Sequence, residues 1–241
     1  MAPAIEIKNF SYNYTDGTNA VRGVDLAIGH GERVAFIGPN GAGKSTLLLG
    51  MCGFVKGGGI VLIDGIEVKK ENIKKIRTLT GSVLQDPDEQ LFMPTLFDDV
   101  AFGPLNMGLD EAEIRRRVEE TMKIVGLGGM AHRPPHHLSA GQKRAAAIAT
   151  VLSMSPKIIT MDEPDSSLDP RSRKRLVELL RTLTQTLVIA SCNMEFVAKL
   201  CDRVVLLDGG KIIADGPARN ILSDAELMER HGLETAKDFA G

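Results

Sequence analysis

The stretch that decides the fold is GPNGAGKST, residues Gly38–Thr46. It follows the apolar run Val34–Ile37, which predicts a short buried strand, and it leads into KSTLLLGMCG, which predicts a helix. The stretch fits the phosphate-loop pattern G-x-x-x-x-G-K-S/T in full. Its glycines allow consecutive N–H groups to point inward, and the helix N-terminus adds positive potential for phosphate oxygens. We therefore expect a nucleotide phosphate site here, rather than a simple glycine turn.

The loop predicts individual roles for its residues. Lys44 is expected to reach the β- and γ-phosphates, and Ser45 is expected to bind Mg²⁺. The nucleotide-contacting residues predicted from the loop are Gly38, Asn40, Gly41, Ala42, Gly43, Lys44, Ser45 and Thr46.

A second buried strand, in KIITMDEP, ends on Asp162 and Glu163. Asp162 can hold Mg²⁺ through water, and Glu163 can orient or deprotonate an attacking water. Taken alone, two acids before Pro164 would equally well open a solvated turn. Beside a phosphate loop, the catalytic interpretation is favoured.

Strand and helix patterns alternate along the 241 residues, which predicts a mostly parallel sheet covered by helices. Residues 88–150 show helical spacing and no strand pattern, so we expect a helical insertion there. No apolar run reaches the roughly 18 residues that a spanning helix needs. The net charge of −2, without a long basic run, argues against nucleic acid as a partner. Three cysteines without close spacing argue against a disulfide framework and fit a reducing cytoplasm.

The stretch LSAGQKRAAAIA, Leu138–Ala149, resembles the signature of ABC-type ATPases, usually LSGGQ, with Ala140 at the first glycine. The motifs also follow that family's order: phosphate loop, VLQDP, signature, IITMDEP and SSLDP. A closer resemblance is to the ATPase of energy-coupling-factor transporters, in particular the cobalt and nickel uptake branch. It is carried by FSYNYTDGTNAVRGVDL, QDPDEQLFMPTLFDDVAFGPLNMGL, HRPPHHLSAGQKR and ERHGLE.

This resemblance implies an α/β fold of the ABC-type P-loop ATPase class, with a mostly parallel core sheet, an antiparallel β subdomain and a helical subdomain. Residues 1–241 would form one ATPase domain. Its expected parts are a nucleotide-binding core with the β subdomain (1–87 and 151–220), a helical signature subdomain (88–150) and a C-terminal helical tail (221–241).

The resemblance also implies a pair of ATPases that sandwich two ATP molecules head to tail, as a homodimer or a heterodimer. Ser139, Gly141 and Gln142 would act across the pair, near the opposite γ-phosphate. The expected partners are a transmembrane coupling protein and a substrate-binding membrane protein. The expected location is peripheral, on the cytoplasmic face of the membrane, and the region around Gln85 to Phe102 would form much of the docking groove.

Three further roles follow from the family pattern. Tyr14 would stack on adenine, with Tyr12 on the same face as the second choice, although a half-buried strand tyrosine fits the spacing equally well. Gln85 would touch Mg²⁺ or the attacking water and sense the membrane partner. Asp169 would pass information between the two sites, and it also looks like a helix N-cap followed by Pro170 at the first helical position.

A departure from the family pattern lies in IASCNMEFV. An ungapped alignment puts Cys192 where the family has a histidine that hydrogen-bonds the γ-phosphate. A thiol is a weak donor, and a thiolate beside phosphate would be repelled, so we expect a neutral thiol. Asn193 could donate instead if the strand end shifted by one residue.

Three interpretations of Cys192 stay open: a weak replacement in a working ATPase, a poorly hydrolysing half of an asymmetric pair, and an engineered or variant residue. A transport-coupled ATPase is favoured, and an ATP-binding clamp is the alternative. A soluble ABC ATPase acting on nucleic acid would carry tandem domains or basic extensions, which the sequence lacks. His136 and His137 are interpreted as loop residues, since the rest of a metal-ligand set is missing.

Overall fold

The computed structural model describes residues 2–236, and its centre is a six-stranded sheet of order β10-β9-β3-β8-β7-β6. Neighbouring strands run parallel, except for the antiparallel pair β9 and β10. The strands are β3 (Arg33–Ile37), β6 (Thr80–Val83), β7 (Ile158–Asp162), β8 (Thr186–Ala190), β9 (Arg203–Asp208) and β10 (Lys211–Pro217). The predicted, mostly parallel sheet is confirmed, and its antiparallel edge is a hairpin of β9 and β10.

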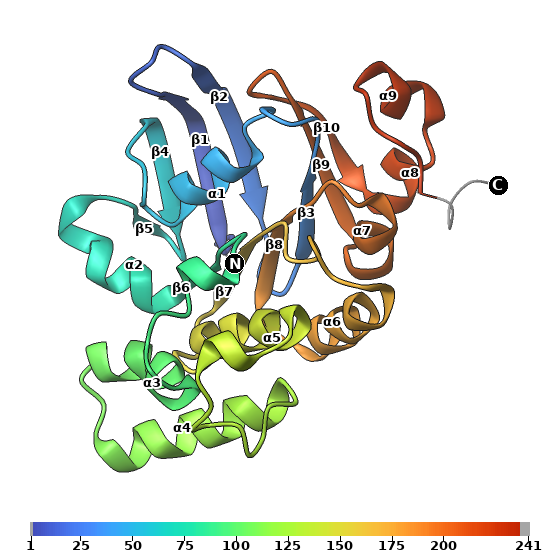
Figure 1. The fold of residues 1–241 in the computed structure, drawn as a ribbon. Coiled ribbons are helices and arrows are strands. Elements are labelled where there is room, and N and C mark those ends of the chain that lie inside the picture. The colour runs from blue at the N-terminus through green and yellow to red at the C-terminus, as the bar shows by residue number, and fades with distance from the viewer. Residues whose placement is uncertain (1, 237–241) are drawn as a thin grey trace.

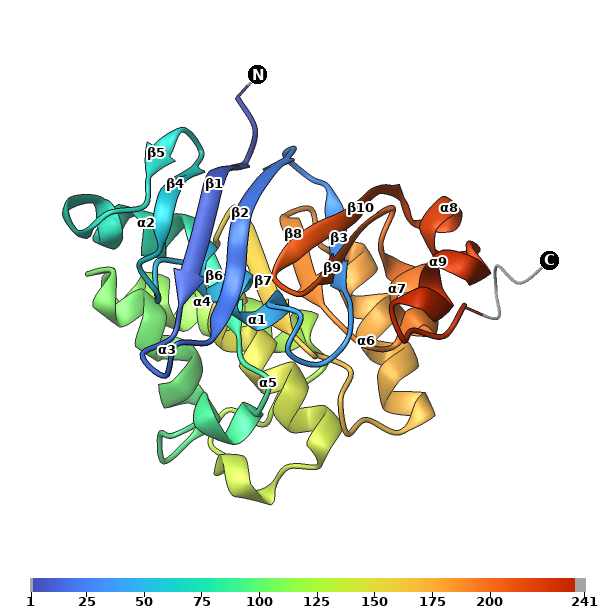
Figure 2. The same cartoon turned by 90° about the horizontal axis from the view of Figure 1, so that it is seen from above.

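A second, antiparallel sheet of order β2-β1-β4-β5 lies beside the first (Figure 2). Its strands are β1 (Ile5–Asn13), β2 (Asn19–Ile28), β4 (Gly58–Ile63) and β5 (Ile66–Glu67). Helix α1 (Lys44–Met51) packs between the two sheets, because its Leu47, Leu48 and Met51 share one buried apolar cluster with residues of both. This sheet confirms the expected antiparallel subdomain.

Helices cover the opposite face of the central sheet (Figure 1). They are α5 (Ala140–Leu152), α6 (Pro170–Thr182), α7 (Met194–Leu200), α8 (Ala218–Leu222) and α9 (Ala225–Arg230). The buried faces of α6 and α7 present Leu176, Leu180 and Phe196 to Ile159 and Leu187 of the sheet. The last five residues of the expected C-terminal tail, 237–241, lie outside the described residues.

The segment 88–150 folds into helices, in the lower part of Figure 1. Helices α3 (Leu96–Asn106) and α4 (Glu111–Ile124) pack with α5 around a separate apolar cluster. Short 3₁₀ turns, η2 (Pro87–Glu89) and η3 (Pro135–His137), flank them; η1 (Lys70–Asn72) and α2 (Ile73–Leu79) precede β6. Within residues 2–236, no helix combines the length and apolarity needed to cross a membrane.

The parallel strands place their carboxyl ends along one edge of the central sheet. Asp162, at the end of β7, pairs with Ala190 at the end of β8, and Ala190 pairs in turn with Phe36 of β3. The loops that follow these strands therefore gather at this edge, which is where open α/β sheets bind ligands.

Candidate nucleotide-binding site

The phosphate loop connects β3 to α1, and close packing requires two of its glycines, Gly38 and Gly43. A Cβ on Gly38 would lie 2.0 Å from the carbonyl oxygen of Leu207, and one on Gly43 would lie 2.3 Å from that of Ala20. Both glycines also have positive φ, at 146° and 100°. The loop is thus pressed against the backbone of β9 and β2, which fixes the position of the helix N-terminus that follows it.

Lys44 is folded over the loop and is only 7% exposed. Its ammonium group donates to the carbonyl oxygens of Gly38 at 2.7 Å and Pro39 at 3.1 Å, and it lies 3.5 Å from the sulfur of Cys192. The cation therefore sits at the loop itself, where phosphate oxygens would gather. Its predicted contact with the β- and γ-phosphates stays a prediction.

Two acids follow β7 at the same edge. The Oδ1 atom of Asp162 is buried and has no hydrogen-bond partner among the described residues, so it remains available as an acceptor. Glu163 has a φ of 44°, a strained value for a residue that is not glycine. Its N–H donates to the carbonyl of Ala190 at 2.9 Å, and its carboxylate accepts the N–H of Cys192 at 3.1 Å. The strain persists because both ends of Glu163 are tied to the end of β8.

Cys192 occupies the position facing the phosphate loop. Its sulfur lies 3.8 Å from Oδ1 of Asn40 and 3.9 Å from the carbonyl of Gly38. Burial raises the pKa of the thiol, the hydrogen bond with Glu163 and its charge raise it further, and Lys44 opposes them. The direction of this pKa shift favours the neutral thiol that the sequence predicts.

Asn193 is not available as a replacement donor. Its amide nitrogen donates to Oδ2 of Asp165 at 2.8 Å, and its amide oxygen accepts the N–H of Phe196 at 3.1 Å. The second bond makes Asn193 the N-cap of α7. The alternative in which Asn193 takes over from the missing histidine is therefore wrong for this arrangement: both ends of the amide are engaged away from the phosphate loop.

The two tyrosines of the first strand region lie together beside the phosphate loop. The hydroxyl of Tyr14 is 2.9 Å from Oγ1 of Thr46, at the start of α1. Tyr14 is 40% exposed, while Tyr12 packs edge-on against it with ring centroids 5.0 Å apart. Tyr12 also packs against the apolar cluster under the antiparallel sheet. Of the two rings, Tyr14 is the better placed to meet a base above the loop.

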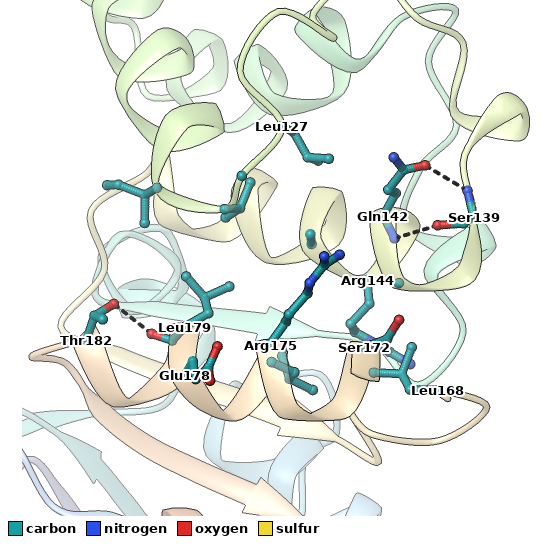
Figure 3. A pocket seen from close by; sticks show the side chains of 16 residues that line it. Leu127, Ser139, Gln142, Arg144, Leu168, Ser172, Arg175, Glu178, Leu179 and Thr182 are labelled. Atoms are coloured by element: carbon teal, nitrogen blue, oxygen red, sulfur yellow. Dashed lines mark hydrogen bonds between the residues drawn. The ribbon is translucent and has the colours of Figure 1, made fainter. Parts of the chain in front are cut away.

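The signature residues form the N-terminus of α5. Ser139 caps the helix, and its hydroxyl and the side chain of Gln142 bond reciprocally to each other's backbone N–H. A Cβ on Gly141 would lie 2.7 Å from Oγ of Ser172 on α6, so this glycine allows the two helices to approach. Figure 3 shows Ser139 and Gln142 at a pocket of 630 Å³ between α5 and α6.

A different cavity, of 580 Å³, is lined by Gly38, Asn40 and Cys192. Within one chain, the signature and the phosphate loop therefore line separate surfaces.

Asp169 caps α6, as predicted, because its carboxylate accepts the N–H groups of Arg171 and Ser172. Pro170 occupies the first helical position directly after the cap. His136 and His137 lie in η3, and their rings meet edge to face, with centroids 4.3 Å apart.

Gln85 follows β6 and is exposed, and its carbonyl accepts a hydrogen bond from Arg144 at 2.7 Å. Arg144 and Asp165 were not predicted as site residues. Arg144 stands four residues before the fully buried Ile148, which puts it on the inward face of α5. A charged residue at helical spacing from buried positions is a sequence signal that could have placed Arg144 on the buried face, although it does not identify Leu84 and Gln85 as its partners.

These features define an ATP-binding cassette: a phosphate loop and two acids at one sheet edge, with a capped signature helix on a helical subdomain. The family described as ABC transporter matches residues 21–166, and the chain belongs to this family.

The relatives support the same assignment. A putative ABC transporter ATP-binding protein of Streptomyces coelicolor is 47% identical over 240 residues, spanning 99% of this chain and 92% of that protein. The energy-coupling factor transporter ATP-binding protein EcfA of Methanothermobacter thermautotrophicus is 46% identical over 235 residues, spanning 95% of this chain and 76% of that protein. The predicted resemblance to ATPases of the energy-coupling-factor class is thereby confirmed.

Solved structures share the fold. The chain cbiO1 of Clostridium perfringens, described as part of the ABC transporter complex cbiONQ, superposes with a TM-score of 0.84 at 38% identity, covering 95% of this chain and 94% of its own. The ATP-binding cassette MJ0796, in a dimeric post-hydrolysis state bound to ADP and Pi, gives 0.79 at 29% identity, covering 89% and 98%.

Proposed function

We propose that this chain is the ATP-hydrolysing subunit of an energy-coupling-factor importer, with cobalt or nickel ions as the cargo that the resemblance implies. The observation that carries the proposal is the joint placement of Lys44, Asp162 and Glu163 at one edge of the sheet. A cation over the phosphate loop, a free carboxylate oxygen and a second, anchored carboxylate are the parts that phosphoryl transfer to water needs.

The residues present fit a magnesium ion. Oδ1 of Asp162 is buried and has no hydrogen-bond partner among the described residues. Burying an unpaired acceptor costs free energy, and a magnesium ion with its water ligands would supply the missing partner. Ser45 opens α1 at the phosphate loop, and with Gln85 it would complete the set that holds the ion. A bound magnesium ion supplies charge neutralisation for the phosphate oxygens.

Glu163 is proposed as the group that orients and deprotonates water. Its carboxylate is held by the N–H of Cys192, so the side chain is fixed before ATP arrives. Cys192 offers only a thiol beside Lys44, which favours slow hydrolysis. An ATP-binding clamp that hydrolyses poorly, as one half of an asymmetric pair, is the second candidate, and the replaced histidine is the observation behind it.

We propose that two such subunits share each ATP. The signature residues Ser139, Gly141 and Gln142 line a surface separate from that of the phosphate loop, so one chain alone leaves them without the nucleotide. The dimeric state of the MJ0796 cassette supports this arrangement. A homodimer is the simplest form, and a heterodimer would place a different chain opposite Cys192. The boundaries predicted within the chain, at 87, 150 and 220, which separate the nucleotide-binding core, the helical subdomain and the C-terminal tail, remain part of this proposal.

A groove of 920 Å³ between α2, β6, α3 and α5 is the proposed docking site for the transmembrane coupling protein. Phe54, Phe92 and Phe102 line it and are 54%, 62% and 41% exposed. Three exposed aromatic rings in one groove provide the apolar contact typical of a binding surface. Docking here would hold the subunit at the cytoplasmic face of the membrane, with a substrate-binding membrane protein completing the transporter.

The test is ATP turnover by the complex purified with its membrane partners. The expected result is turnover by the unaltered chain and its loss in Glu163→Gln, which keeps the size of the side chain and removes the base. ATP binding with no turnover in either protein would favour the clamp. Failure to retain a membrane protein in the nucleotide-free, ATP-bound and ADP-bound states would contradict the transport proposal.

A further inference from the structure

Arg144 is a buried cation in the signature helix α5, and it is only 3% exposed. One terminal nitrogen of its guanidinium donates to the carbonyl of Leu84 at 2.7 Å, and the other donates to the carbonyl of Gln85 at 2.7 Å. Two short bonds from one planar group to consecutive carbonyls fix both distance and orientation, which an ammonium group does not do. Figure 3 shows Arg144 on the same helix as Ser139 and Gln142.

A second contact of the same segment also goes to α5. Strand β6 ends at Val83, and the side chain of Gln90 then bridges the loop to the helix. Its amide nitrogen donates to the carbonyl of Ala147 at 2.8 Å and to Oγ1 of Thr150 at 2.7 Å. Its amide oxygen accepts the N–H of Leu84 at 3.0 Å. The loop is thereby closed on itself and fastened to the helix.

The outer part of the loop carries one more contact to α5, an ion pair between Lys143 and Asp88 at 2.6 Å. Asp88 is 61% exposed, so this pair contributes little by itself. The pair matters for geometry, because the contacts of Arg144, Gln90 and Lys143 all join this loop to the same helix, α5. Beyond the end of β6, the place of Gln85 is therefore set by α5.

Burying the charged guanidinium of Arg144 costs desolvation free energy, which an apolar contact between α5 and the loop would avoid. Burial lowers the pKa of its guanidinium, and the charges of Asp165 and Asp86 oppose that shift. An apolar side chain in its place would leave the carbonyl groups of Leu84 and Gln85 without these two donors, so Arg144 is tied to the conformation of this loop.

We propose that Arg144 is a positioning residue that sets the place of Gln85 from the signature helix. The inference rests on the proposed role of Gln85 at the magnesium ion or the attacking water. It has a mechanical consequence: the loop carrying Gln85 and the signature at the start of α5 move as one body. A displacement of the docking groove, which Gln90 also lines, then reaches both motifs together.

The test compares Arg144→Met with the unaltered chain in the purified complex, and repeats the comparison in a Gln85→Ala background. Losing two charge-assisted bonds that act through Gln85 is expected to lower kcat about tenfold or more, with KM for ATP changed less than about twofold. In the Gln85→Ala background, the same change is expected to cost less than about twofold, because coupled residues are not additive. Equal losses in both backgrounds would overturn the inference.

Arg144→Lys is the matched control, since it keeps the charge and loses the two-pronged geometry. Its kcat is expected to fall about as far as that of Arg144→Met. Full activity in the lysine variant would show that the two parallel bonds of the guanidinium are not needed, and it would overturn the inference.

Amide hydrogen exchange of the full chain separates this inference from the proposed hydrolysis. Arg144→Met is expected to speed exchange in 84–91 about tenfold while the amides of α5 keep their protection. Unchanged exchange in 84–91 would overturn the inference even if the unaltered chain hydrolysed no ATP, and faster exchange with no turnover would count against the proposed hydrolysis alone.

Discussion

The change Cys192→His restores a strong donor at the end of β8. The sulfur of Cys192 lies 3.5 Å from the ammonium of Lys44 and 3.8 Å from Oδ1 of Asn40, so a side chain at this position faces the phosphate loop. An imidazole reaches further than a thiol and donates a full hydrogen bond to a phosphate oxygen. The backbone N–H of residue 192 keeps its bond to Glu163, because that bond does not depend on the side chain.

The expected gain follows from the strength of the added bond. A hydrogen bond to a charged group contributes about 1.5–3 kcal/mol, whereas a thiol contributes much less. If the bond forms in the transition state, kcat rises by about tenfold to a little over a hundredfold, since each ~1.4 kcal/mol is a factor of ten. The residual rate of the unaltered chain is then what Lys44 and Glu163 support without it.

The assay is steady-state ATP turnover of the complex for four proteins: the unaltered chain, Cys192→His, Cys192→Ser and Cys192→Ala. Serine is the matched control because it differs by one atom and donates better than a thiol. The expected order is His, then Ser, then the unaltered chain, then Ala. Because the pKa of the thiol is raised, the unaltered chain should show no titration of Cys192 between pH 6 and 8. The His variant should add one near ~6.5.

Equal turnover in all four proteins, within twofold, would refute the reasoning. It would mean that position 192 makes no contact with the nucleotide in the transition state. Turnover in Cys192→His from a silent parent would instead identify the unaltered chain as a clamp.

Three other expectations follow. Gly43→Ala should weaken ATP binding more than about a hundredfold in a fluorescence titration, because its Cβ would press on a carbonyl oxygen; Gly41→Ala, with nothing within 4 Å, should cost clearly less. Burial raises the pKa of Cys201 to about 12. Its contribution to stability is complete below ~8.5 and falls by about 1.4 kcal/mol per pH unit as pH rises toward 12. Cys201→Val should flatten that part of a urea-denaturation series. Phe92→Ser combined with Phe102→Ser should abolish co-purification of the membrane partner and leave ATP binding unchanged, whereas the same change at Leu105, which is exposed outside the groove, should leave both intact.

Local patterns were enough to predict the parts of the site that depend on neighbours in the sequence. The phosphate loop, the strand ending on Asp162 and the cap at Asp169 each follow from a few adjacent residues. Arg144 and Asn193 could not be assigned in this way, because their partners lie 59 and 28 positions away along the chain. The cap formed by Asn193 does follow a local pattern, because an asparagine directly before a helical segment is a common N-cap.

The residues on either side of Cys192, Ser191 and Asn193, are both hydrogen-bonded to Asp165. Ser191 donates to Oδ1 of Asp165 at 2.9 Å, and Asn193 donates to Oδ2 of the same carboxylate at 2.8 Å. Asp165 is 3% exposed, so the residues on both sides of Cys192 are locked to one buried acid. Together with the hydrogen bond from the N–H of Cys192 to the strained Glu163, this frame holds the backbone at position 192 in one place. The hydrogen-bonded frame on both sides of Cys192 is therefore in place, and the departure from the family pattern lies in one side chain that faces the phosphate loop.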